Sequence, residues 1–446
     1  MKKSFKLLLL TVLALICALM FTSCGESEPS SENPTSKDDG KTIVLNVFNW
    51  GEYISDGFEG SLDSVAEFED YYFEKFGKKV KVNYSTYATN EDMYSKLTSG
   101  AGSYDIVVPS DYMIDRLIEE NWLLPFDAST IENYKYIDDE FKNLYFDKDN
   151  MYSVPYTYGM LGIIYNKELV DEEDVRDESW GLLWNPKYRG KILQFNNPRD
   201  AFASAMYFEG IDVNTTDKAD WDRALAKLIE QKPLIQGYVN DEIFNKMTTA
   251  SAAVAPYFAG DFITMAADNP DLCFYYPKEG SNYFVDSMCI PKNSKNPEVA
   301  KEFINFMLSE EPAIANAIYI GYASPNTLVR NLALDGESNE YTDALLEYTP
   351  DAIEILYGKS PEQVNVNYKF NPCYESFSSD IQEYTNALWE SLKTENSTEL
   401  WVHLTTVVIV VAVLSLAIYK VVIEKIRSKD YRLRDKQRKK AKQVKS

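Results

Sequence analysis

Short apolar runs alternate with amphipathic helical patterns through the first third of the chain, and this alternation restricts the fold most strongly. Strands are predicted at 42–48, 79–84 and 105–108, and helices at 62–76, 90–97 and 111–120, with Asn90 as the expected cap of the second helix. Strand, helix and strand in this order form a parallel sheet covered by helices. We therefore predict an α/β fold. Ligands bind beyond the carboxyl ends of such strands, so the loops 49–53 and 109–112 are candidate ligand loops.

The N-terminus has the pattern of an export signal. Residues 1–23 combine a lysine-rich start with an apolar run that is short for a membrane span. Cys24 follows Phe21-Thr22-Ser23, which resembles a bacterial lipobox with Phe21 in place of the usual aliphatic residue. We expect Cys24 to be the lipidated first residue of the mature protein; the alternative is an ordinary cleaved signal. Residues 24–41 are polar and rich in Ser and Pro, as in a tether.

A second membrane anchor is predicted near the C-terminus. Residues 400–419 contain no Asp, Glu, Lys or Arg, and at about 1.5 Å per residue a helix of this length spans about 30 Å. Trp401 and Tyr419 lie at its two ends, where interfacial aromatic residues belong. Residues 420–446 contain twelve basic and three acidic residues, so the positive-inside rule predicts a cytoplasmic tail. A buried core helix is the alternative for the apolar stretch.

Charge and residue usage exclude several classes of function. The formal net charge of −24 argues against a nucleic-acid partner. The single histidine, His403, excludes Ser-His-Asp, Cys-His and HExxH chemistry. Cys273, Cys289 and Cys373 fit no zinc motif and are odd in number, so we expect buried free thiols and no metal site. No cofactor is predicted, and the chain is not expected to be an enzyme, although an acid–base pair of carboxylates stays open as an alternative.

Seven motifs resemble PotD-type periplasmic spermidine/putrescine-binding proteins, in the same order along the chain. They are FNWGEYI (48–54), YSTYATNEDMYSKL (84–97), YDIVVPSDYMIDRL (104–117), YSVPYTYG (152–159), WNPKYRGKI (184–192), YPKEGSNYFVDSMCIP (276–291) and IGYASPN (320–326). The resemblance covers about residues 42–393. It implies a two-lobe periplasmic-binding-protein fold of type II, which closes over its ligand. The first lobe would comprise 42–154 and 286–393, including a final helix near 380–393, and the second lobe 155–285.

The same resemblance implies the residues of a polyamine site. Carried over motif by motif, the expected ligand-binding residues are Trp50, Tyr53, Ser110, Tyr112, Asn197, Asp200, Tyr257, Phe284, Asp286, Tyr322 and Glu375. Asp200 and Asp286 would bind ammonium groups. Tyr257 and Phe284 replace tryptophans of the family, and Asn197 replaces a carboxylate. Because an amide accepts a hydrogen bond but neutralises no charge, this last change leaves open which polyamine is preferred.

The resulting hypothesis is a receptor of an ABC importer, anchored at the extracytoplasmic face of a bacterial membrane. It would deliver spermidine or putrescine to a permease and its ATPase. Aromatic rings suit the methylene chain and carboxylates suit the ammonium groups of such ligands. Two alternatives stay open: a receptor for another cation such as thiamine or iron, and a membrane-tethered ligand sensor.

Overall fold

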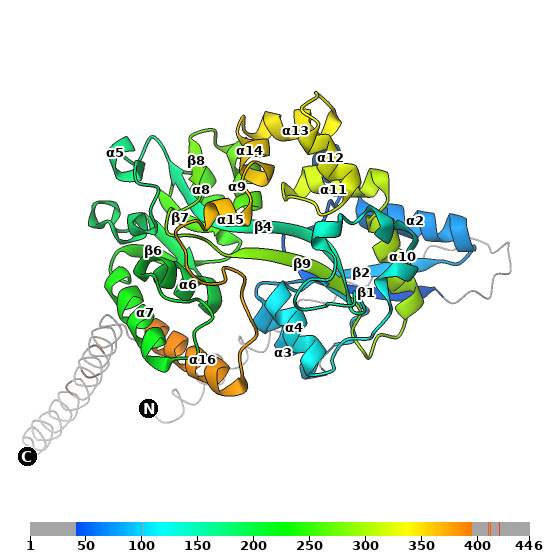
Figure 1. The fold of residues 1–446 in the computed structure, drawn as a ribbon, viewed down its shortest axis with the longest axis horizontal. Coiled ribbons are helices and arrows are strands. Elements are labelled where there is room, and N and C mark those ends of the chain that lie inside the picture. The colour runs from blue at the N-terminus through cyan, green and yellow to red at the C-terminus, as the bar shows by residue number, and fades with distance from the viewer. Residues whose placement is uncertain (1–41, 101, 395–408, 410, 412–418, 420–446) are drawn as a thin grey trace, which may run out of the picture. The chain divides into compact units, whose positions relative to one another are not determined.

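One mixed sheet runs through the computed structural model, which describes residues 42–100, 102–394, 409, 411 and 419 (Figure 1). Within these residues the strand order is β2-β1-β3-β9-β4-β7-β5-β6, and β8 pairs with β4. The strands are β1 (Ile43–Trp50), β2 (Val80–Tyr87), β3 (Ile106–Val107), β4 (Ser153–Asn166), β5 (Ile192–Phe195), β6 (Ile235–Val239), β7 (Val254–Phe258), β8 (Leu272–Tyr275) and β9 (Tyr283–Cys289).

The first lobe has the predicted parallel arrangement. β1 lies between β2 and β3 and is parallel to both. The connecting helices are α2 (Ser64–Phe76), α3 (Asn90–Thr98) and α4 (Asp111–Glu119). Asp63 caps α2, and Gly77 ends it with φ of 63°. The predicted cap of α3 is wrong: Thr89 accepts the backbone N–H of Asp92, and Asn90 is the first helical residue, because Thr89 has the extended backbone that a cap requires.

Two antiparallel strands connect the lobes. β4 pairs with β9 from Ser153 to Met160, and then continues into the second lobe, where it pairs with β7 and β8. The predicted lobe boundaries at residues 154 and 286 both fall inside these two strands. A register shift between Pro155 and Thr157 interrupts the pairing. Such a bulge bends a strand locally, so the lobes meet at an irregular point of the sheet.

The second lobe surrounds β5, β6, β7 and β8. Its helices include α5 (Glu172–Val175), α6 (Pro198–Glu209), α7 (Lys218–Gln231), α8 (Glu242–Thr248) and α9 (Ala259–Asp268). The chain then returns through α10 (Pro297–Met307), α11 (Glu310–Ile320), α12 (Thr327–Leu334), α13 (Glu340–Tyr348), α14 (Ala352–Tyr357), α15 (Pro361–Val364) and α16 (Ser379–Thr394). Short 3-10 helices are η1 (Phe58–Gly60), η2 (Ala128–Thr130), η3 (Glu132–Tyr136), η4 (Asp139–Phe141), η5 (Trp180–Trp184) and η6 (Pro186–Tyr188).

The final helix belongs to the second lobe, so its predicted place within the first lobe is wrong. α10 packs on α2 of the first lobe, but α16 packs on α6 and α7 (Figure 1). The ring of Trp389 lies 5.3 Å from that of Tyr238 and 6.4 Å from that of Phe202. The apolar stripe of α16 is buried where the second lobe offers an apolar surface. The spacing of that stripe predicts a helix but cannot identify its partner.

Several predictions concern residues that the structure does not describe. The signal at 1–23, Cys24, the tether at 24–41 and the tail at 420–446 all lie outside the described residues, as does most of the predicted span at 400–419. In the described part of the chain, no helix combines the length and the apolar character that crossing a membrane requires. Also within that part, Cys273, Cys289 and Cys373 are free thiols as predicted; Cys289 is buried as expected for all three, whereas Cys273 and Cys373 are partly exposed.

Candidate functional site

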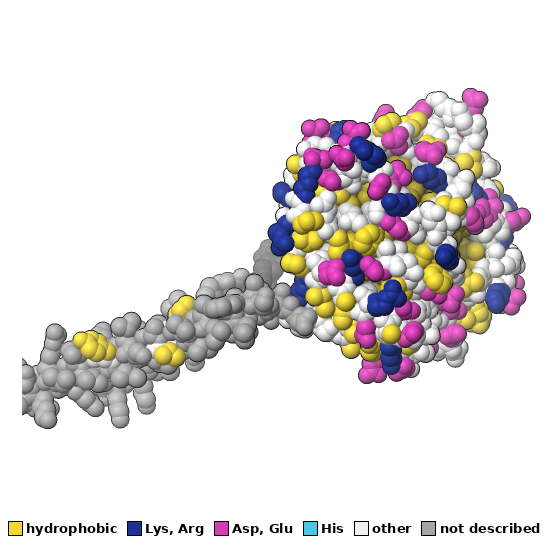
Figure 2. Space-filling model, turned by 60° about the vertical axis from the view of Figure 1, so that its left-hand side comes forward, with side chains coloured by type: hydrophobic (Ala, Val, Ile, Leu, Met, Phe, Trp, Pro, Cys, Tyr) yellow, Lys and Arg dark blue, Asp and Glu magenta, His cyan; other side chains and the backbone are white. Residues whose placement is uncertain are grey.

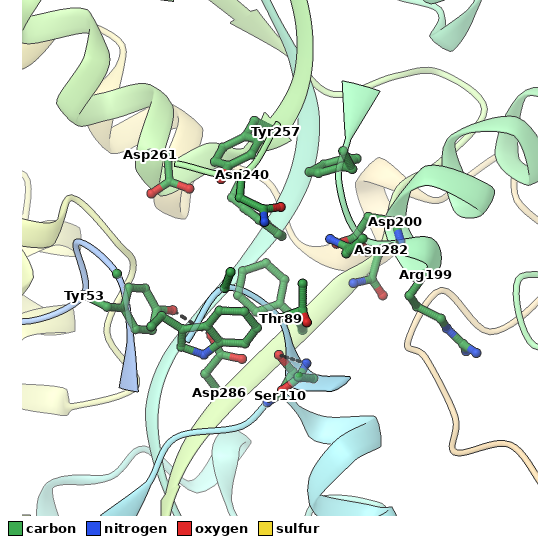
Figure 3. Close-up of a pocket in the computed structure, with 18 of the residues that line it drawn as sticks. Tyr53, Thr89, Ser110, Arg199, Asp200, Asn240, Tyr257, Asp261, Asn282 and Asp286 are labelled. Atoms are coloured by element: carbon green, nitrogen blue, oxygen red, sulfur yellow. Dashed lines mark hydrogen bonds between the residues drawn. The ribbon is translucent and has the colours of Figure 1, made fainter. Parts of the chain in front are cut away.

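A cleft lies where loops at the carboxyl ends of strands from both lobes meet. It contains about 890 Å³ of empty space, part of it open to solvent. Loops after β1, β2 and β3 line it from the first lobe, and loops after β5, β6 and β7 line it from the second. Figure 3 shows their side chains converging on this space, with β9 passing along one wall. The rule for parallel sheets therefore holds in both lobes.

Ten of the eleven predicted ligand residues line this cleft. They are Trp50, Tyr53, Ser110, Tyr112, Asn197, Asp200, Tyr257, Phe284, Asp286 and Tyr322. The predicted place of Glu375 in the cleft is wrong. Its side chain is exposed, and its Oε1 accepts a hydrogen bond from Asn371. The chain is not helical here, and the neighbouring Tyr374 is the residue that faces the cleft.

Asp286 lies on β9 and is 4% exposed. Its Oδ2 accepts a hydrogen bond of 2.7 Å from the hydroxyl of Tyr53, which also contacts the hydroxyl of Thr157. Its Oδ1 is buried and makes no hydrogen bond of ordinary geometry among the described residues, although the hydroxyl of Ser110 is close enough to Asp286 to lower its pKa. Burial raises the pKa of Asp286 to about 6, since a carboxylate away from water is less stable in its charged form. The Oδ1 atom can accept a hydrogen bond from a cationic donor.

Asp200 lies in the first turn of α6, opposite the first lobe. Asn197 caps this helix by accepting the backbone N–H of Asp200 at 2.8 Å. Its amide nitrogen in turn donates to Asp200 Oδ2 at 2.8 Å, and the hydroxyl of Tyr374 donates to Oδ1 at 2.9 Å. Burial raises the pKa of Asp200 to about 6 despite these two donors. Asn197 therefore both ends the loop and orients the carboxylate.

Aromatic side chains form the apolar walls of the cleft. The indole nitrogen of Trp50 donates to the carbonyl of Val108 at 2.8 Å, which holds the ring at the mouth of the loop. The ring of Tyr322 meets that of Tyr53 edge-on at 4.9 Å, and lies 6.4 Å from that of Phe284. Rings in these positions cover a methylene chain and present π-electron density to ammonium groups.

Five charged residues that line the cleft were not among the predicted ligand residues: Glu91, Asp111, Arg199, Asp241 and Asp261, of which only Asp111 lies in a predicted ligand loop, 109–112. Four of them are acidic, and each of these follows the carboxyl end of a strand, so a systematic use of that rule would have found them. Asp261, in the first turn of α9, accepts the hydroxyl of Tyr322 at 2.9 Å. Burial raises the pKa of Asp261 to about 8.

Arg199 balances this acidity only in part: burial raises the pKa values of Glu91, Asp111 and Asp200, and the charge of Arg199 lowers them. Its guanidinium donates to Asn214 Oδ1 and to the carbonyl of Glu375, and it lies 3.8 Å from the centre of the Phe377 ring. Figure 3 shows Arg199 pointing away from the cavity that the labelled carboxylates face. By contrast, acidic and basic side chains are interspersed on the face that Figure 2 shows. The cleft is therefore lined by six carboxylates and one arginine, together with aromatic rings.

This arrangement suits an elongated organic cation. Buried carboxylates with raised pKa values are unfavourable alone and become favourable when positive charges pair with them. Separated carboxylates with aromatic surface between them match a ligand with several cationic groups on an apolar chain.

Comparison with known proteins finds similarity to bacterial proteins that bind solutes outside the cell. Residues 64–345 match the family described as bacterial extracellular solute-binding protein. The spermidine/putrescine-binding periplasmic protein of Escherichia coli (strain K12) is 34% identical over 326 residues, 72% of this chain and 87% of the relative. The putrescine-binding periplasmic protein PotF of the same strain is 28% identical over 300 residues, 64% and 78% of the two chains. A solved structure, described as a putative spermidine/putrescine ABC transporter from Listeria monocytogenes, superposes with a TM-score of 0.67 at 35% identity, covering 80% of this chain and 100% of that one.

Proposed function

Because the chain belongs to the PotD-type spermidine/putrescine-binding group of the bacterial extracellular solute-binding proteins, we propose that it is a polyamine receptor. It captures spermidine or a related polyamine outside the cytoplasm and delivers it to an ABC permease. The observation that carries the proposal is the cleft itself. It is lined by six carboxylates, by aromatic rings and by one arginine, whose guanidinium is held by Asn214 and Phe377.

Polyamine binding reduces the electrostatic repulsion among the carboxylates of this cleft. The carboxylates lie close enough to raise one another's pKa: the charges of Asp286 and Asp241 both act on Asp261, and that of Asp200 acts on Asp286. An ammonium group replaces this repulsion with charge-assisted hydrogen bonds, which are stronger than neutral ones. The Oδ1 of Asp286 is one acceptor for it. Neutral or anionic solutes would leave the carboxylates unpaired.

Binding and lobe closure are expected to be coupled. Tyr53 comes from the first lobe, Asp200 from the second, and Asp286 from the strand that passes between them. A ligand that touches all three stabilises the closed arrangement more than an open one, so it shifts the population toward closure. No covalent step is required, since recognition by the closed lobes is sufficient for delivery.

We also propose how the receptor is held at the membrane. The pattern of residues 1–23 supports export, and Cys24 is the proposed site of lipidation. Residues 400–419 are the proposed transmembrane helix, with the basic residues 420–446 on the cytoplasmic side. Such anchoring raises the effective concentration of the receptor beside a permease and its ATPase. Mass spectrometry of the mature protein tests lipidation: an N-terminal diacylated Cys24 supports it, and an unmodified Cys24 refutes it.

Calorimetric titration of the full-length protein with spermidine, putrescine and a non-amine diol tests the main proposal. Saturable binding of a polyamine, with no heat from the diol, is expected. The absence of binding by any polyamine, in folded and ligand-free protein, would refute the ligand class and leave the two-lobe fold unaffected.

A further inference from the structure

The segment between α15 and α16 contains a strap, residues 371–377, that is hydrogen-bonded to both lobes. On the side of the second lobe, Asn214 Oδ1 accepts the backbone N–H of Glu375 at 2.9 Å. On the side of the first lobe, the hydroxyl of Ser376 donates to Asp115 of α4 at 2.8 Å. Figure 1 shows the segment running from α15 to α16. The strap therefore links the lobes in addition to β4 and β9.

Arg199 of α6 holds the strap from the second lobe. Its Nη2 donates to the carbonyl of Glu375 at 3.2 Å and to Asn214 Oδ1 at 2.9 Å. Its guanidinium carbon lies 4.5 Å from the ring centre of Tyr374 and 3.8 Å from that of Phe377. The residue is 8% exposed, so these contacts are largely shielded from water. A cation held between two rings and a carbonyl is well placed to fix the strap on α6.

Arg199 also acts on the first lobe. Its guanidinium carbon lies 5.5 Å from the ring centre of Tyr112, whose hydroxyl donates to Glu91 at 3.0 Å. Burial raises the pKa values of Glu91 and Asp111, and the charge of Arg199 opposes both shifts. These three first-lobe residues lie in the first turns of α3 and α4. A cation of the second lobe is therefore attracted to the acidic edge of the first lobe.

A positive charge at the wall of a cation site has two opposite consequences. It repels a bound polyamine, which lowers the affinity. It also attracts the acidic edge of the other lobe and holds the strap, which favours lobes closed around the ligand. The second consequence is the larger one here, because the guanidinium points away from the cavity and makes its short contacts with the strap and Asn214 (Figure 3).

We propose that Arg199 is a positioning residue that fastens the second lobe to the strap and to Tyr112 of the first lobe, and so slows the release of ligand. The inference rests on the proposed function, because ligand release is the step that Arg199 affects. Arg199 and Asp200 are neighbours in the first turn of α6. One element therefore carries both the fastening of the lobes and an expected partner of the ammonium groups, which couples closure to binding.

The test is stopped-flow measurement of spermidine association and release, followed by tryptophan fluorescence, in the full-length protein and its Arg199→Met variant. Methionine keeps an unbranched apolar side chain but has no charge and no N–H donor. Release should become about tenfold faster or more, and association should change less than about threefold, because the lost contacts belong to the closed lobes.

Arg330→Met is the matched control. Arg330 forms an ion pair with Asp138 at 2.9 Å and does not line the cleft. Like Arg199, it has a buried Nε without a hydrogen-bond partner among the described residues. Its substitution removes a comparable partly buried cation from another place, so both rates should stay within about twofold of those of the original protein.

A second variant tests the inference if Arg199→Met does not fold. Ser376→Ala combined with Tyr145→Phe removes two hydrogen bonds from the first lobe to the strap, to Asp115 and to the carbonyl of Tyr374, and neither substituted side chain lines the cleft. This double variant should release spermidine several-fold faster. It should add little to the effect of Arg199→Met, because both changes break the same connection.

Three outcomes would overturn the inference. Release from Arg199→Met could be unchanged or slower, which would show that the charge acts mainly by repelling the ligand. The faster release at pH 7.5 could disappear at pH 8.5, which would show that Arg199 acts only by keeping Asp200 ionised. Release from the double variant could equal that of the original protein. Absence of spermidine binding by the original protein would instead refute the proposed function itself.

Discussion

Replacing Asp286 by Asn should change ligand affinity and the stability of the free protein in opposite directions. The substitution keeps the shape of the side chain and an oxygen that can still accept the hydroxyl of Tyr53, but it removes the charge. In the complex, a bound ammonium group loses its buried charge partner. Truncating one partner of such a pair costs about 2–4 kcal/mol, which corresponds to roughly 30- to 1,000-fold weaker binding.

The free protein should become more stable at neutral pH. Burial raises the pKa of Asp286 to about 6, whereas an unfolded aspartate has a pKa of about 3.9. The stability that the bound proton contributes is therefore present below about pH 4 and is lost as the pH rises through 6. A shift of about two pKa units corresponds to about 3 kcal/mol, which is an upper figure for what Asp286→Asn regains above pH 7. The gain should vanish toward pH 4.

The assay combines calorimetric titration with spermidine and thermal unfolding of the ligand-free protein at pH 7.5 and pH 4.5. Asp147→Asn is the control, because Asp147 is also a buried carboxylate. It accepts the backbone N–H groups of Met151, Tyr152 and Ser153 outside the cleft. That variant should unfold at a lower temperature and keep its affinity. Our reasoning would be refuted if Asp286→Asn bound spermidine within about threefold of the original protein. A lower unfolding temperature at pH 7.5 would show instead that Asp286 is a structural acceptor.

Three further predictions concern the cleft and the final helix. Polyamine affinity should fall by roughly fivefold per titrating carboxylate between pH 6 and pH 5, because Asp200 and Asp286 have pKa values of about 6 and must be ionised in the complex. Titrations in buffers of different ionisation enthalpy should show proton release, and an affinity that does not change with pH would contradict this. Tyr374→Phe removes the hydroxyl that donates to Asp200 and should weaken polyamine binding several-fold. Glu375→Gln should change the affinity by less than about twofold, because the side chain is exposed. Calorimetry on both variants decides whether Glu375 lies outside the site. Trp389→Ala should lower the free energy of unfolding by about 3–5 kcal/mol. It should also increase hydrogen exchange in α6 and α7 but not in α2, since α16 packs on the second lobe. Faster exchange in α2 instead would contradict that assignment.

The general plan of the cleft could be predicted without the structure because it depends on local patterns. Alternating apolar runs define strands whose carboxyl ends carry the loops 49–53 and 109–112, and both loops line the cleft. The family resemblance then located residues further along the chain, such as Asp200 and Asp286, by motif. For the two loops, a short stretch of sequence determines both its own backbone form and the position of its side chains at the end of a strand.

Only the tertiary structure decided which distant side chains share the cleft and which orientation they take. Tyr374 and Glu375 are neighbours in a non-helical segment, and only packing against α6 turns the first inward and the second outward. The helix α16 has an ordinary apolar stripe, and the surface of α6 and α7 selects its partner. The hydrogen bonds of Asp286 depend on all the neighbours that surround it. Contacts between residues far apart in the chain set these features, and such contacts leave no periodic signal in the sequence.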